Sequence, residues 1–186
     1  MGQRFQIIAI NKKERAAFHH QWLYGASAVN VALDALNYAA EDPAGDGSPL
    51  VSGHSDISFA DDLLHVLSNI YRGAQRDKKE VECILDITDE LVKDNYRMGD
   101  NNDGVLILDL REFAKPRYCF LSNSNVGSDR KPNPLSGAAY VKTYYSTIHK
   151  DEETKEWYGE IKKGLAKFTL LKQQEVMDLF PQVNYQ

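Results

Sequence analysis

Cysteine is scarce in this chain of 186 residues, which contains only Cys83 and Cys119, each within an apolar stretch. Small secreted scaffolds that are held together by disulfides need more cysteines than this, and low cysteine usage fits a reducing compartment. We interpret both residues as small buried hydrophobic side chains. A single disulfide between them is the alternative.

Long hydrophobic runs are also missing. No apolar stretch approaches the roughly 20 residues that a membrane-spanning helix needs. The N-terminal stretch MGQRFQIIAINKKER is too short in its apolar part and too charged to be a signal peptide. We therefore expect no membrane partner and a cytoplasmic location, which is the host cytoplasm or the virion if a phage encodes the protein.

Positive charge is in deficit, because 22 Lys and Arg face 27 Asp and Glu, and no run of five basic residues occurs. A protein that binds a phosphate backbone needs a basic footprint, so the sequence carries no strong nucleic-acid signal. The Gly-x-Gly-x-x-Gly and Gly-x-Ser-x-Gly motifs are absent. Gly159 and Gly164 have the spacing of a P-loop without its Lys and Ser/Thr. We expect no cofactor and assign no catalytic residue.

The hydrophobic content of 42% is typical of a globular protein. We expect a single domain over 1–186, with two long loops at 41–57 and 122–135 and a C-terminal extension. Short β-rich or apolar runs and helical spacing predict the following elements: strands at 4–10, 16–22, 105–110, 117–121 and 165–171, and helices at 26–40, 58–73, 79–93, 136–145 and 172–180. The continuous apolar run at 105–110 predicts a central strand covered on both faces, and Ser136 is predicted to cap the helix that follows it. The charged segment 151–156 is interpreted as solvated. Strands in hairpins and a block of helices indicate an α+β fold, with an antiparallel sheet and helices packed on it.

The stretch FHHQWLYG at 18–25 is the main candidate for a functional site. In a strand, alternation places His20 and Trp22 on one face and His19 on the other, so the two histidines cannot easily share a metal, and no metal site is expected. One interpretation makes His20 a core histidine between aromatic rings. The other interpretation is a ligand site at the start of the following helix, made by Arg4, His20, Trp22, Tyr24 and Gly25.

Other polar residues give weaker signals. The segment Gly99–Gly104 is rich in Asp and Asn, but it does not fit an EF-hand register and is interpreted as a turn. Asp100, Asp103 and Asp109 flank an apolar strand and would matter for acid–base chemistry only if they met His20. Tyr140, Tyr144 and Tyr145 fit either an interface or core packing.

The opening MGQRFQIIAI and the FHHQWLYG cluster resemble a group of uncharacterised small proteins from phages, bacteria and fungi. An Asn/Asp-Gly turn before an apolar strand, as in NNDGVLILDL, is a further shared feature. The group has no assigned activity, so the resemblance implies no reaction. It implies that the recurring positions cluster in space, which here are Gly2, Gln3, Arg4, His20, Trp22 and Gly25.

Two functions are consistent with these observations. The first is a binding or assembly module, such as a phage accessory or virion-associated protein, with a protein partner or a second copy of the chain. The second is a protein that binds a nucleotide or another small molecule, or a phosphodiester hydrolase. In that case Arg4 would contact phosphate, His20 would move a proton and Trp22 would stack on a base.

Overall fold

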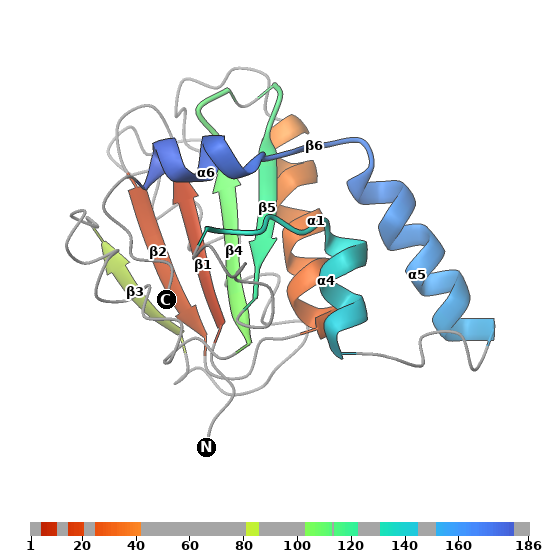
Figure 1. Cartoon of the computed structure of the whole chain (residues 1–186). Helices are drawn as coiled ribbons and strands as arrows, with labels where there is room; N and C mark the ends of the chain where they lie inside the picture. The colour runs from red at the N-terminus through yellow and green to blue at the C-terminus, as the bar shows by residue number, and fades with distance from the viewer. Residues whose placement is uncertain are drawn as a thin grey trace.

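The structure is a computed structural model that describes residues 5–10, 15–20, 25–41, 81–85, 103–112, 114–122, 131–144 and 152–180. Two of these ranges, 15–20 and 81–85, are described by their backbone. The elements along the chain are β1 (Phe5–Ile10), β2 (Arg15–His20), α1 (Gly25–Glu41), β3 (Val81–Leu85), β4 (Gly104–Asp109), β5 (Arg117–Leu121), α4 (Gly137–Tyr144), α5 (Glu152–Leu165), β6 (Thr169–Leu170) and α6 (Gln173–Leu179). The strands form one sheet in the order β3-β2-β1-β4-β5-β6 (Figure 1).

The α+β class is confirmed, but the prediction of an antiparallel sheet is wrong because the sheet is mixed. The two predicted hairpins exist, since β1 pairs with β2 and β4 pairs with β5, both antiparallel. The hairpins join through β1 and β4, which run parallel, and β6 adds to β5 in parallel as well. Sequence patterns identify the partners within each hairpin, but they do not specify how two hairpins meet.

β1 and β4, the two strands that pair in parallel, are suited to the centre of the sheet because their side chains are mostly apolar on both faces. Every residue of both strands is buried, as expected for parallel strands that are covered on both faces. The predicted central strand at 105–110 therefore has the expected environment. Strands with an exposed polar face would not bury their side chains in this position.

The predicted helix at 79–93 is wrong at its start, where the structure has the strand β3. Val81, Ile84 and Leu85 recur at helical spacing, but a short apolar run fits a buried strand equally well. Val and Ile are β-branched and favour strands. The predicted helix at 58–73 lies outside the described residues.

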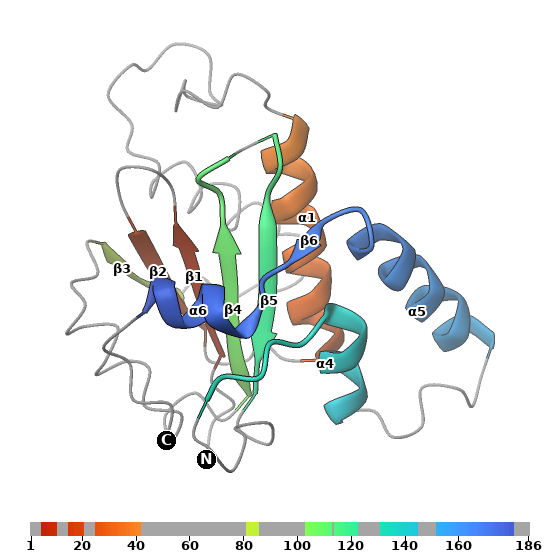
Figure 2. The ribbon, with the colours of Figure 1, turned by 45° about the horizontal axis from the view of Figure 1, so that its top comes forward.

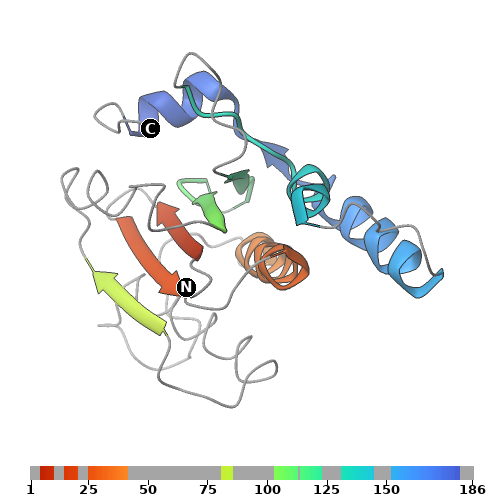
Figure 3. The same cartoon turned by 60° about the horizontal axis from the view of Figure 1, so that its bottom comes forward.

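Helices cover both faces of the sheet, and each face has its own apolar core. Phe5, Ile7 and Ala9 of β1 point into the core under α1, α4 and α5. Ile8 and Ile10 point to the opposite face, where they pack with Val176 and other residues of the α6 region. Figure 3 shows α1 and α6 on the two sides of the sheet.

Close helix contacts hold α4 and α5 against α1. A Cβ atom on Gly137 would lie 2.3 Å from Leu165 and 3.0 Å from Val29, so a side chain there would push the helices apart. The segment 151–156, interpreted above as solvated, contains the start of α5. This helix has a charged exposed face and buries Ile161 and Leu165 on the other side. Figure 2 shows that α5 extends away from the sheet beyond α4.

Tyr140 belongs to the core. Its side chain is fully buried and stacks on Phe120 at 4.5 Å, and its hydroxyl donates a hydrogen bond of 2.6 Å to the carbonyl of Asp103. The core interpretation is therefore right for this tyrosine. The carbonyl that it contacts belongs to the turn before β4, where Gly104 has φ of 113°.

The sheet order excludes a disulfide between the two cysteines. Cys83 lies on β3 and Cys119 on β5, four strand spacings apart, or about 19 Å. Disulfides need Cα atoms within about 7 Å. Cys119 is a buried free thiol, as predicted. Among the described helices, none combines the length and apolar character that crossing a bilayer requires.

Candidate functional site

A buried carboxylate marks the carboxyl end of the central strands. Asp109 ends β4, directly opposite Arg117 on β5, and only 2% of its surface is exposed. The backbone N–H of Leu110 donates to the carbonyl of Ile10 at 2.7 Å, which continues the parallel pairing of β4 with β1. In open sheets, ligands bind outside the carboxyl ends of parallel strands, so this end is a favourable position for a site.

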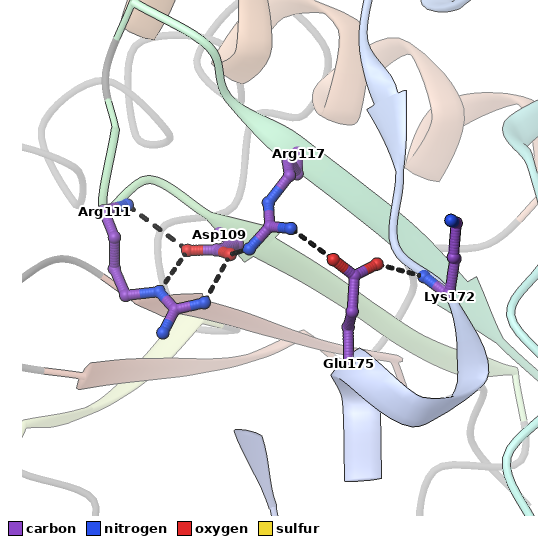
Figure 4. A network of polar contacts seen from close by, with 5 residues as sticks. All are labelled: Asp109, Arg111, Arg117, Lys172 and Glu175. Carbon is purple, nitrogen blue, oxygen red and sulfur yellow. Dashed lines mark hydrogen bonds and ion pairs between the residues drawn. The ribbon is translucent and has the colours of Figure 1, made fainter. Parts of the chain in front are cut away.

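Asp109 has all of its hydrogen-bonding capacity in use. Arg111 donates to it from Nε at 2.8 Å, from Nη2 at 2.9 Å and from its backbone N–H at 3.3 Å. Arg117 Nη2 also donates to Oδ2 (Figure 4). A carboxylate offers about four lone-pair positions. Asp109 is therefore neither a general base nor a metal ligand in this state, and its role is to orient two guanidinium groups.

The pKa of Asp109 lies below its ordinary value of 3.8. Burial by itself raises this pKa, but the hydrogen bonds from Arg111 and Arg117 outweigh burial and lower it. The same contact raises the pKa of Arg111. The carboxylate is consequently ionised at neutral pH, and both cations stay fixed against it.

A second carboxylate reaches Arg117 from the helix that covers this face. Glu175 Oε1 accepts a hydrogen bond of 2.5 Å from Arg117 Nη1. Its other oxygen accepts one of 2.8 Å from the backbone N–H of Lys172 and so caps the start of α6. Figure 4 shows Arg117 between the two carboxylates, Asp109 on the strand and Glu175 on the helix.

Both arginines keep unused hydrogen-bond donors. A guanidinium has five N–H donors. Arg111 uses two of them on Asp109, and Arg117 uses one on Asp109 and one on Glu175. In the part of the chain that the structure describes, the remaining three donors of each guanidinium have no protein partner. The Arg111 side chain is 43% exposed and that of Arg117 is 29% exposed, so both reach solvent.

These donors border a pocket of about 550 Å³. Its volume lies in the usual range for sites that bind small molecules. The described lining residues are all charged or polar, and none of them is aromatic. The lining consists of Asp109, Arg111, Glu112, Lys115, Arg117 and Thr169.

The site predicted from FHHQWLYG is described in only two positions. Arg4, Trp22 and Tyr24 lie outside the described residues. His20 is the last residue of β2, and the structure describes its backbone. Gly25 opens α1, is buried, and has φ of 53°, a conformation that glycine adopts without strain. The ligand-binding role of this cluster stays a prediction.

His20 and the arginine pair lie at opposite ends of the sheet. Phe5, at the start of β1, pairs with His20 and Gly104, whereas Ile10, at the end of β1, pairs with Asp109. The two ends are roughly 17 Å apart along the strand. Asp109 therefore does not meet His20, which was the condition for an acid–base pair.

Sequence reasoning missed the arginine pair although one signal was available. Strands at 105–110 and 117–121 were both predicted, and a hairpin with these bounds brings Asp109 opposite Arg117. Glu175 had no such signal, because it lies 58 residues from Arg117 in the chain.

Comparisons with known proteins assign no family to this arrangement. A scan against protein-family models and searches of curated proteins and of solved structures find no match to the chain. The resemblance to small phage, bacterial and fungal proteins therefore stays a hypothesis, and the case for function depends on the geometry described above.

Proposed function

We propose that this protein binds a small phosphate-bearing ligand in the pocket at the carboxyl end of β4. The observation that carries the proposal is the pair of partly exposed guanidinium groups that share the buried Asp109, each with three donors that have no partner among the described residues. Guanidinium groups bind phosphate through several charge-assisted hydrogen bonds. Because Asp109 holds both groups in place, less side-chain entropy is lost when the ligand binds.

The lining of the pocket favours a small and polar ligand. A nucleotide base needs an aromatic platform on which to stack, and the described lining provides charged side chains and Thr169 instead. Lys115 adds a third cation to Arg111 and Arg117, and with the carboxylates of Asp109 and Glu112 the lining keeps a net charge of +1, which suits a small anion. This supports a phosphometabolite or inorganic phosphate more than the nucleotide predicted from the sequence.

The proposal is for binding. A hydrolase needs a group that accepts a proton from water. Asp109 does not fill this role because its oxygens are occupied and its pKa is lowered. An assembly module stays a prediction as well, and buried Tyr140 no longer supports it.

The test measures pyrophosphate binding by isothermal titration calorimetry and by the shift in thermal unfolding. Chloride at matched ionic strength is the reference. We expect saturable binding and, at a hundredfold excess over Kd, a stabilisation of about 2.7 kcal/mol. Lys115→Gln removes one exposed cation from the pocket, and we expect affinity to fall about fivefold.

Lys155→Gln is the matched control. Lys155 is an exposed residue of α5 that pairs only with the exposed Glu152, at 2.5 Å, among the described residues, so this variant has the same change in net charge away from the pocket. Equal affinities of the Lys115 variant, the Lys155 variant and the wild type would contradict the proposal. The absence of any stabilisation beyond that of chloride would also contradict it.

A further inference from the structure

We infer that Glu175 competes with the ligand for Arg117 and thereby sets the affinity of the pocket. This inference rests on the proposed function, because it names the residue that tunes that same site. Glu175 Oε1 lies 2.5 Å from Arg117 Nη1, which is the contact that a ligand oxygen would make. In the absence of ligand, the carboxylate of Glu175 therefore occupies the position on Arg117 that a ligand oxygen would take.

The two carboxylates on Arg117 differ in how easily they can leave. Asp109 is 2% exposed and is held by four hydrogen bonds, so it stays with the strand. Glu175 is 35% exposed and already partly hydrated, so it gives up the Arg117 contact at less cost than Asp109 would, while its other oxygen makes the capping contact with the Lys172 N–H. An anion that approaches Arg117 therefore displaces Glu175 and leaves Asp109 in place.

Helix α6 keeps its position when Glu175 leaves Arg117. Val176, Leu179 and Phe180 are buried in the apolar core on this face. Gln173 Nε2 also donates a hydrogen bond of 2.9 Å to the carbonyl of Pro132. These contacts do not involve Glu175, so displacement changes the charge beside the pocket without removing the helix.

The test compares pyrophosphate affinity of the wild type and of Glu175→Gln. Glutamine still accepts the capping hydrogen bond from the Lys172 N–H, but it has no charge with which to hold Arg117. We expect Glu175→Gln to bind pyrophosphate about fivefold more tightly. A defect in folding would lower affinity, so a gain in affinity distinguishes competition from a structural role.

Asp178→Asn is the control on the same helix. Asp178 is exposed and accepts a hydrogen bond of 2.8 Å from Gln174, so its removal changes net charge equally without contact to Arg117. We expect this variant to bind like the wild type. If the wild type binds and Glu175→Gln binds equally or more weakly, this inference is overturned and the proposed function stands. If neither protein binds pyrophosphate, the proposed function fails and the inference fails with it.

Discussion

Replacement of Asp109 by Asn is the most direct test of the role assigned to the buried carboxylate. Asp109 accepts four hydrogen bonds, three of them from guanidinium groups. Asparagine retains one acceptor oxygen and presents an NH₂ group toward cationic donors, so at least part of this arrangement is lost. The folded state then holds two guanidinium groups beside a neutral, poorly matched side chain.

The loss of stability in Asp109→Asn depends on how deeply the two arginines are buried. Breaking a buried ion pair costs about 3 to 5 kcal/mol. Arg111 and Arg117 are 43% and 29% exposed and can be rehydrated, so we expect the low end, about 3 kcal/mol. For a chain of this length, that loss lowers Tm by about 6 to 12 °C.

Denaturant unfolding of Asp109→Asn measures this loss, with Asp178→Asn as the surface control, expected within about 0.5 kcal/mol of the wild type. The pH dependence gives an independent check. Because the pKa of Asp109 is depressed in the folded state, its contribution is fully present above the ordinary value of 3.8 and is lost as pH falls through the lower folded value. The difference between wild type and variant should therefore shrink in acid. A variant as stable as the wild type at pH 7, with an unchanged m-value, would refute the reasoning.

Three further predictions concern two glycines and the buried cysteine. Gly104→Ala should destabilise the protein by about 2 to 3 kcal/mol, because φ is 113° and a Cβ atom would lie 2.5 Å from the carbonyl oxygen of Leu121. Gly159→Ala, in α5 with no described atom within 4 Å of the added Cβ, should instead stabilise by about 0.5 to 1 kcal/mol. Equal effects of both changes in denaturant unfolding would contradict this contrast. Cys119 should resist alkylation in the native state, because burial and the charge of Glu175 raise its pKa. Peptide-resolved mass spectrometry should find it labelled only after unfolding, and rapid native labelling would show that the α6 face is open.

The local parts of the fold were accessible from the sequence, whereas the long-range parts were not. The apolar run Tyr118–Leu121 and the cap at Ser136, whose Oγ accepts a hydrogen bond of 3.2 Å from the Ala139 N–H, are features of a few neighbouring residues. The parallel contact of β1 with β4 depends on which two buried strands meet, and no local pattern encodes that choice.

The candidate site divides in the same way. Asp109 and Arg117 face each other across a short hairpin, so the strand bounds contain this pair. Glu175 reaches the site only because α6 packs across the sheet, and that packing depends on the apolar side chains of Val176 and Leu179. The sequence directed attention to His20 because histidine and tryptophan are conspicuous, while an Asp–Arg pair at a strand end resembles ordinary surface charge.

The parallel pairing of β1 with β4 also has a consequence for how the chain folds. Ile10 and Arg15, which close the first hairpin, are five residues apart, whereas Phe5 and Gly104 are separated by about a hundred. Loop-closure entropy grows with separation, so the hairpins can form early while the contact between them must wait for a distant search. Folding speed should therefore be limited by the meeting of two preformed ribbons, and the arginine pair is assembled within one of those ribbons before the sheet is complete.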